Sequence, residues 1–203
     1  MSRGKSRDRL LEVGLELFGT KGYAATGVQD IADAAEVPKG SFYNYFDSKE
    51  DFAVAVLERY REQAATHFAQ LTSPENTSPL GRLEAFLREM ETQMVASSFG
   101  GGCLAGRLAQ ELAGEQVAFR EPLCHVFSSM QGAVEQCLRQ AQAAGELAAD
   151  EAPALLAGFL VNTWQGAMLR AKAAGSTAPL AAARQILFSR LLVVPQSGSS
   201  AAT

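Results

Sequence analysis

The fold of this chain is decided by residues 26–50, which read Thr26-Gly-Val-Gln-Asp-Ile-Ala-Asp-Ala-Ala-Glu-Val-Pro-Lys-Gly-Ser-Phe-Tyr-Asn-Tyr-Phe-Asp-Ser-Lys-Glu50. Four apolar side chains follow Thr26 at helical spacing, which predicts a short amphipathic helix with Thr26 as its N-cap. Glu36 and Val37 then turn the chain, and Pro38 suits the start of a second helix, where its missing N–H costs nothing. A helix, a turn and a helix in this order are typical of DNA-binding units. The four apolar residues are Val28, Ile31, Ala32 and Ala35.

The second helix, expected over residues 38–46, has one apolar face and one polar face. Phe42 and Phe46 lie four residues apart, which predicts that both are buried. A long cation or an amide tip reaches base edges from such a helix, so Lys39 is expected to read guanine and Asn44 adenine. Other polar groups near this face are expected to hold phosphates. They are Thr26, Ser41, Tyr43, Tyr45 and Lys49.

A third helix is expected to start at Ser48, with Asp51 completing an acidic variant of the capping box. Lys49 then lies at a helix N-terminus, in a position to contact a phosphate. In the preceding helix, Gly40 keeps one turn thin, so the backbone can approach DNA closely. The alternative interpretation is a small helical core segment whose polar face is only solvated.

The order of these motifs resembles the TetR family of bacterial one-component regulators. That family's signature is an amphipathic helix ending in Phe and Gly, then Thr, Ile-Ala, Val, Lys-Gly, an aromatic cluster and Ser-Lys-Glu. One departure is Pro38, which replaces the more usual small polar residue before Lys39. The matching positions are Leu17-Phe18, Gly22-Tyr23, Thr26, Ile31-Ala32, Val37, Lys39-Gly40, Phe42 to Phe46 and Ser48-Lys49-Glu50.

Composition sets limits on the class of protein. A chain of 203 residues with 47% hydrophobic content can bury a sizeable core. No apolar run approaches the ~20 residues of a membrane span and no secretory segment is visible, so a cytoplasmic protein without a membrane partner is expected. Three cysteines, widely spaced, match neither a disulfide framework nor a zinc pattern, and no metal or cofactor is expected.

The net charge of −4 is unusual for a protein that binds nucleic acid, but the location of charge matters more than the total. Four cations against one Asp8 make the extreme N-terminus basic. This segment is either a solubilising start to the first helix or an arm that contacts phosphates or the minor groove. The cations are Arg3, Lys5, Arg7 and Arg9.

The rest of the chain predicts helix after helix, hence an all-α fold of about nine helices. Residues 1–50 form the expected DNA-binding domain, a helix over 48–71 links it to a helical domain over 51–194, and residues 195–203 form an expected disordered tail. A stripe of apolar residues at alternating steps of three and four marks the helix after the 72–79 break. It consists of Leu80, Leu83, Leu87, Met90 and Met94. The other expected helices span about residues 5–20, 103–112, 119–144, 151–173 and 179–193.

The resemblance implies that the C-terminal domain forms a homodimer and binds a small-molecule effector. The last two expected helices are rich in small and apolar residues, which suits a four-helix interface across a two-fold axis as well as a simple core. Aromatic and Met side chains offer candidates for a ligand cavity, although each is also what a packed core contains. The cavity candidates are Phe86, Met90, Phe99, Leu108, Phe127, Met130, Phe159 and Trp164.

Residues 99–108 read Phe-Gly-Gly-Gly-Cys-Leu-Ala-Gly-Arg-Leu, so Cys103 follows three glycines and opens a helix. A thiol there is expected to be accessible and activated by the helix dipole, with Arg107 adding a positive charge one turn later. Gly-Cys-Leu in this place resembles a subgroup of TetR-like repressors that sense electrophiles or oxidants through that cysteine. The alternative is a small buried residue fitted to a tight helix start.

The remaining cysteines and histidines carry weaker signals. Cys124 and Cys137 are expected in the core, although Cys124 beside His125 also suits a resolving thiol with a base. His67 has no visible partner and is expected to be a residue of the linking helix without a functional role.

These patterns favour a homodimeric repressor that binds an inverted-repeat DNA operator and is released by a small molecule or by modification of Cys103. A non-covalent hydrophobic effector with a structural Cys103 is the first alternative. A cysteine-dependent enzyme is more remote, because no phosphate loop, metal spacing or group to orient His125 is visible. A protein-binding helical module without DNA contact is a third class, in which Lys39→Ala and Tyr43→Ala would leave partner binding intact.

Overall fold

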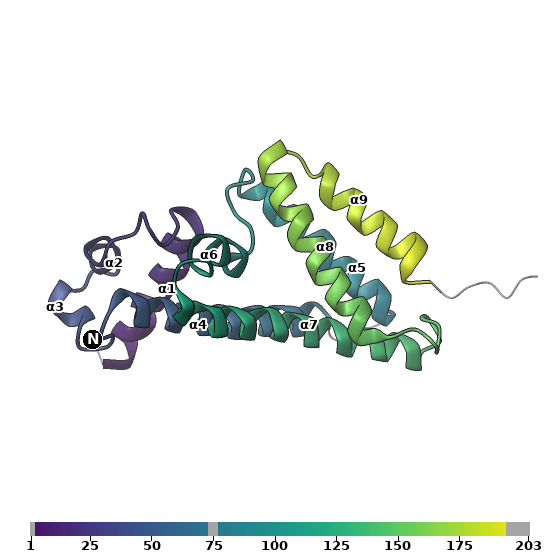
Figure 1. Cartoon of the computed structure of the whole chain (residues 1–203), viewed down its shortest axis with the longest axis horizontal. Helices are drawn as coiled ribbons and strands as arrows, with labels where there is room; N and C mark the ends of the chain where they lie inside the picture. The colour runs from purple at the N-terminus through teal and green to yellow at the C-terminus, as the bar shows by residue number, and fades with distance from the viewer. Residues whose placement is uncertain (1–2, 73–76, 194–203) are drawn as a thin grey trace, which may run out of the picture.

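The computed structural model describes residues 3–72 and 77–193, and every regular element in those ranges is a helix. The prediction of an all-α fold with an N-terminal helix-turn-helix unit is therefore confirmed (Figure 1). The helices are α1 Arg3–Thr20, α2 Val28–Ala34, α3 Lys39–Phe42, α4 Lys49–Leu71, α5 Pro79–Ala96, α6 Leu104–Leu112, η1 Val117–Phe119, α7 Arg120–Ala143, α8 Pro153–Ala174, α9 Ala178–Ile186 and η2 Leu187–Leu191.

The helices α1, α2 and α3 form a small N-terminal head around a cluster of aromatic rings. Phe52, at the start of α4, lies 5.2 Å from Phe42 and 4.9 Å from Phe46 between ring centroids. Phe18 of α1 closes the cluster 5.8 Å from Phe52. All four side chains are buried, as the spacing predicted for Phe42 and Phe46, so the first turns of α4 belong to the core of the head.

Gly14 lets α1 and α4 approach closely in the head. A Cβ atom at Gly14 would lie 2.6 Å from Phe52 Cζ and 2.6 Å from Val56 Cγ2, closer than carbon atoms pack. The absence of a side chain at this position therefore sets the spacing of the two helices.

Two local predictions in the head are wrong. The N-cap of α2 is Gly27, whose N–H donates to Asp30 Oδ2 at 2.7 Å, and Thr26 lies one residue before it. The predicted helix over residues 38–46 is assigned as α-helix only over Lys39–Phe42, because the next three residues form tight turns with bonds such as Tyr45 N to Phe42 O at 3.0 Å.

The long helix α4 runs from the head into the C-terminal helices. Ser48 caps it, since Ser48 Oγ accepts the N–H of Asp51 at 3.0 Å. Its first half packs on α1, and its second half runs beside α7 along one side of the molecule (Figure 1).

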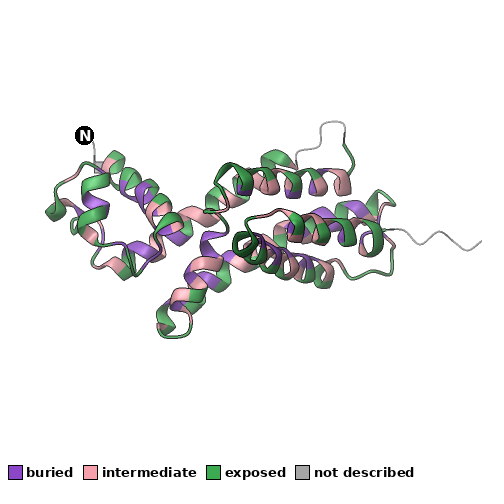
Figure 2. Cartoon of the chain, turned by 90° about the horizontal axis from the view of Figure 1, so that it is seen from above, coloured by how far each residue is buried: buried purple, intermediate pink, exposed green. Residues whose placement is uncertain are grey.

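The C-terminal domain packs α5, α7, α8 and α9 together, with buried residues facing inward (Figure 2). Arg184 of α9 fixes part of this arrangement by bonding Glu91 at 2.8 Å and Glu84 at 3.0 Å, both on α5. The predicted helix over 179–193 ends as α-helix at Ile186 and continues as the π-helical turn η2. The predicted tail over 195–203 lies outside the described residues.

Across residues 3–72 and 77–193, none of the helices combines the length and the apolar character that crossing a membrane requires.

Candidate functional site

The polar face of α3 and the turn after it point away from the head core. Lys39, Tyr43 and Asn44 are exposed, and the Tyr43 side chain is 51% accessible although it is a large aromatic ring. Within the described residues, a Cβ at Gly40 would meet no atom within 4 Å beyond its chain neighbours and its own helix backbone, so packing does not require glycine there. Ser41 and Tyr45 are half-buried at the edge of this face. The contacts of these side chains with DNA stay predictions.

Thr26 is not part of this exposed face. Its side chain is fully buried, and its hydroxyl donates to Gly22 O at 2.6 Å. Gly22 adopts a φ of 90°, in the left-handed region that favours glycine. The hydroxyl of Thr26 therefore closes the turn between α1 and α2, and the prediction that this side chain holds a phosphate is wrong.

Lys49 is held against the head at the start of α4. Its ammonium lies 4.0 Å from the centroid of the Tyr23 ring, which is a cation–π contact. Burial lowers the pKa of Lys49, and the charges of Glu111 and Asp30 partly oppose that shift. A phosphate contact by Lys49 stays a prediction. In the basic N-terminal segment, which is the first part of α1, the Arg7 guanidinium lies 5.4 Å from the Phe46 ring centroid.

A cavity of about 440 Å³, which we call the apolar chamber, lies among α4, α5, α7 and α8. Five of the predicted sensor residues line it: Phe86, Met90, Cys103, Met130 and Trp164.

Four cavity candidates lie elsewhere. Leu108 is fully buried in the core, and Phe159 is 51% exposed on α8. Phe99 and Phe127 are half-buried against the core without lining the chamber. The assignment of these four side chains to the cavity was wrong, because helical spacing identifies an apolar face but not the neighbour that covers it.

Other residues of the chamber were missed. Tyr60, His67 and Phe68 line it from the second half of α4. Their positions at i, i+7 and i+8 lie on one helical face, in the part of α4 that extends beyond the head, and this spacing was the available signal. Gln93, Gln165 and Met168 also line the chamber.

Trp164 has a distinct position in the chamber wall. It is 4% exposed, and its Nε1 is buried without a hydrogen-bond partner among the residues that the structure describes. A buried donor without an acceptor is unfavourable, so this N–H is available to an acceptor atom that enters its surroundings.

Cys103 is the N-cap of α6. Its Sγ accepts the N–H of Gly106 at 3.4 Å and the hydroxyl of Tyr60 at 3.5 Å. Burial first, and then the neighbouring Cys103, raise the pKa of Tyr60 well above its usual value, so the hydroxyl keeps its proton and remains a donor. Cys103 is only 8% exposed, so the glycines before it do not leave the thiol openly accessible as expected.

A second cavity of about 290 Å³, which we call the polar cleft, lies between the end of α1, α6 and α8. Arg107 and Lys172 line it, and Cys103 lines both cavities. The Arg107 guanidinium donates to Gly19 O at 2.7 Å and lies 3.5 Å from Glu111. Within the described residues no hydrogen bond joins Arg107 to the Cys103 sulfur, so the predicted partnership of this cation with the thiol is not found.

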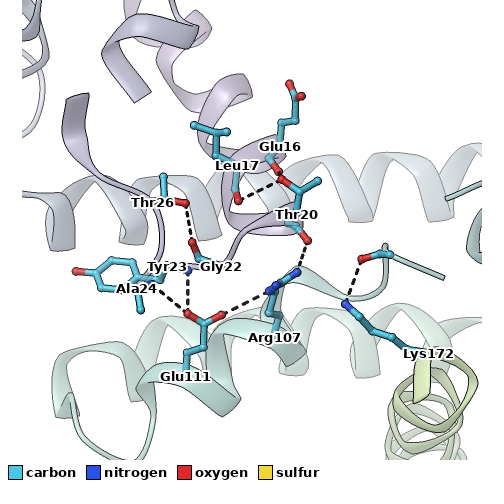
Figure 3. A network of polar contacts seen from close by, with 12 residues as sticks. Glu16, Leu17, Thr20, Gly22, Tyr23, Ala24, Thr26, Arg107, Glu111 and Lys172 are labelled. Atoms are coloured by element: carbon cyan, nitrogen blue, oxygen red, sulfur yellow. Dashed lines mark hydrogen bonds and ion pairs between the residues drawn. The ribbon is translucent and has the colours of Figure 1, made fainter. Parts of the chain in front are cut away.

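Helix α6 holds the head through two side chains (Figure 3). Glu111 Oε2 accepts the N–H of Tyr23 at 2.9 Å and that of Ala24 at 3.2 Å. Arg107 bonds the last turn of α1, and Lys172 of α8 donates to Gly100 O at 3.1 Å, just before α6. No local pattern points to Glu111, because its partners in the head lie more than 80 residues away in the chain.

The other cysteines separate into one exposed and one buried residue. Cys124 is exposed, so its predicted core position is wrong, and Cys137 is buried as predicted. His125 is also exposed, 3.9 Å from Glu121. Within residues 3–72 and 77–193 no cluster of His, Cys, Asp and Glu has the arrangement of a metal site.

Two family models match the chain. The model described as "Bacterial regulatory proteins, tetR family" matches residues 10–56, and "Tetracyclin repressor-like, C-terminal domain" matches residues 79–187. The transcriptional regulator AcuR of Cereibacter sphaeroides is 43% identical over 80% of this chain and 74% of its own length. The HTH-type transcriptional repressor DhaR of Mycobacterium sp. strain GP1 is 35% identical over 95% of both chains.

Solved structures agree with this result. The regulatory protein TetR from Rhodobacter sphaeroides superposes with a TM-score of 0.84 at 40% identity, covering 93% of this chain and 99% of its own. The fold, the helix-turn-helix head and the relatives lead to one conclusion: the chain belongs to the TetR family of transcriptional regulators.

Proposed function

We propose that this protein is a homodimeric repressor that binds an inverted-repeat operator and is released by occupation of the apolar chamber or by modification of Cys103. One observation carries the proposal. Cys103 lines both cavities and caps α6, and the same short helix bears the two side chains, Arg107 and Glu111, that hold the head. A change at Cys103 therefore acts on the helix that positions the DNA-binding unit.

The exposed face of α3 supports the DNA contacts. Lys39 and Asn44 offer a cation and an amide for base edges, while Ser41, Tyr43 and Lys49 offer donors for phosphates. One such face makes few contacts, so two heads about one helical turn of DNA apart are needed for specific binding.

Exposed apolar side chains on α8 and α9 support the dimer. Leu155 is 74% exposed, Phe159 51% and Ile186 56%, which is costly for a monomer in water. We expect the double variant Phe159→Asp, Ile186→Asp to sediment as a monomer. The control Val117→Asp, at a side chain that is 69% exposed on η1, keeps the dimer. A double variant that sediments like wild type contradicts the interface.

The effector acts because it binds more tightly to the state of the protein that has released the operator. A ligand shifts a two-state equilibrium only by its difference in affinity for the two states, and about a 10⁴-fold difference moves it from 1:99 to 99:1. A partial shift of this equilibrium needs a smaller difference in affinity, so even a modest distortion of α6 reduces operator occupancy.

The test is operator binding with DNA from upstream of the protein's own gene, before and after N-ethylmaleimide. Wild type, Cys103→Ser and the matched control Cys124→Ser, whose thiol is exposed, are compared. Release from wild type and Cys124→Ser but not from Cys103→Ser supports control through Cys103. Release from all three overturns that route, and failure to bind any fragment overturns the repressor proposal.

A second candidate is a repressor with a non-covalent effector and a structural Cys103. The low exposure of Cys103 and its two hydrogen bonds favour this candidate. It predicts that Cys103→Ser binds operator and still responds to a ligand in the apolar chamber.

A further inference from the structure

The apolar chamber and the polar cleft share a wall. Gly102, Cys103, Gln165 and Met168 line both cavities, so a mainly apolar space and a charged one adjoin at these residues. A single ligand that spans this wall would have two chemically different ends.

The charged end of such a ligand is indicated by two cations. Arg107 and Lys172 both line the polar cleft, on α6 and α8. The pKa of Lys172 is lowered first by burial and then by the charge of Arg107, so the two cations are close enough to repel one another. An anion between them relieves this repulsion and gains two charge-assisted hydrogen bonds.

Glu111 also lines the polar cleft, but both of its carboxylate oxygens already have partners. Its Oε2 accepts two backbone N–H groups of the head, and its Oε1 lies 3.5 Å from Arg107. Among the residues that the structure describes, the hydrogen-bond partner of Lys172 is a backbone carbonyl, Gly100 O. The three side chains carry a net charge of +1, which leaves the cleft short of one negative charge.

The apolar end is indicated by the larger chamber. Phe86, Met90 and Met130 supply apolar walls, and Trp164 adds a buried N–H without an acceptor among the described residues. A hydrocarbon body fits the walls, and a polar atom of the ligand satisfies the indole N–H.

We propose that the effector is an amphiphilic organic anion, with its apolar body in the apolar chamber and its carboxylate or phosphate between Arg107 and Lys172 in the polar cleft. This inference rests on the proposed function and adds the chemical class of the ligand. It also gives the ligand a means of action. Arg107 holds the last turn of α1 through Gly19 O, and an anion that draws the guanidinium toward itself weakens this hold.

The test uses Trp164, the only tryptophan of the chain, as a fluorescent reporter in the chamber wall. Full-length protein is titrated with octanoate, octyl phosphate and octanol, which have the same number of carbon atoms in one unbranched chain and differ in the head group. We expect at least one of the two anions to bind about tenfold more tightly than octanol, and the preferred anion identifies carboxylate or phosphate.

Lys172→Gln is the informative variant, and Lys21→Gln is its matched control, because Lys21 is exposed and lines neither cavity. We expect Lys172→Gln to reduce the preference for the anion to about threefold or less, and Lys21→Gln to keep it. Equal affinity of wild type for octanol and both anions overturns the inference. So does an unchanged preference in Lys172→Gln, or no binding of any probe by fluorescence and calorimetry.

The two proposals fail separately. If the protein releases its operator on thiol modification but binds octanol as tightly as both octanoate and octyl phosphate, the anion site is refuted and the repressor proposal stands. If the protein prefers one of the two anions through Lys172 but binds no operator, the repressor proposal is refuted and the anion site stands.

Discussion

Glu111 accepts the backbone N–H of Tyr23 at 2.9 Å, and this contact joins the C-terminal domain to the turn that follows α1. The same carboxylate accepts the next N–H, that of Ala24, at 3.2 Å. Two backbone donors that would otherwise need water are thus held by a side chain from a distant part of the chain. The head is tied to α6 by polar contacts of defined geometry as well as by packing.

Replacing Glu111 with Ala is expected to lower the free energy of unfolding by about 1–3 kcal/mol, because the two N–H groups lose a charged acceptor. Glu111→Gln is expected to lower the free energy of unfolding less, since the side-chain carbonyl of Gln still accepts the backbone N–H groups. Urea unfolding measures both, with Glu115→Ala at an exposed carboxylate as the control. Equal stability of Glu111→Ala and Glu115→Ala would contradict the role of this contact.

Thr26→Val keeps the side-chain volume and removes the hydroxyl that bonds Gly22 O. We expect a loss of about 1–2 kcal/mol in stability and no change in the salt dependence of operator affinity. Lys39→Gln is expected to do the reverse, weakening operator binding by about 1–3 kcal/mol with little effect on folding. Denaturation and DNA titrations at several salt concentrations separate the two variants. If operator affinity depended less steeply on salt concentration in Thr26→Val than in wild type, Thr26 would be a phosphate contact after all.

Gly14→Ala is expected to destabilise the protein by about 1–3 kcal/mol, because the new methyl group enters the space of Phe52 and Val56. Gly132 is on the exposed side of α7, and a Cβ there would meet no described atom within 4 Å outside its chain neighbours and its own helix backbone. Gly132→Ala is therefore expected to stabilise by up to about 1 kcal/mol. Thermal unfolding gives both values, and a Gly14→Ala variant as stable as wild type would rule out the tight helix contact.

Alkylation by N-ethylmaleimide is expected to reach the exposed Cys124 first and Cys103 more slowly. In a Cys124→Ser background, Tyr60→Phe is expected to slow the reaction of Cys103 severalfold, because a donor to the reacting sulfur is lost. Peptide mass spectrometry follows each site over time. Faster alkylation in Tyr60→Phe would mean that the Tyr60 hydroxyl only shields the sulfur.

Cys137 gives an expected dependence of stability on pH. Burial raises the pKa of its thiol above the ordinary value of 9.0; the charge of Arg82 opposes this shift and that of Glu146 adds to it. Since the folded pKa is the higher one, the contribution to stability is complete below pH 9.0 and is lost as the pH rises through the folded pKa. Urea midpoints at about pH 8 and pH 10 should therefore differ less in Cys137→Ala than in wild type. If the urea midpoint changed equally with pH in wild type and in Cys137→Ala, a contribution of the Cys137 thiol would be contradicted.

The sequence was sufficient for the parts of the fold that depend on neighbours in the chain. Phe42 and Phe46 share one helical face, which predicts their burial inside the head, and Ser48 has its partner three residues away, which predicts the cap of α4. Both follow from spacing alone.

The sequence was insufficient where a distant partner decides the role of a side chain. For Thr26 the partner, Gly22 O, is four residues away, but the left-handed φ of Gly22 in the turn that brings the two groups together does not follow from residue spacing. Arg107 was assigned to the thiol one turn earlier in the chain, but Gly19 O and Glu111 hold its guanidinium. Cys103 was expected to be open because glycines precede it, yet Tyr60 covers it from α4.

The length of α4 amplifies small movements. Its 23 residues rise about 1.5 Å each, so the helix is a rod of roughly 34 Å. A tilt of about 5° at the end beside Phe68 displaces the other end by about 3 Å, which equals the length of one hydrogen bond. The apolar chamber can therefore stay nearly unchanged in shape while Lys39 moves out of reach of a base edge.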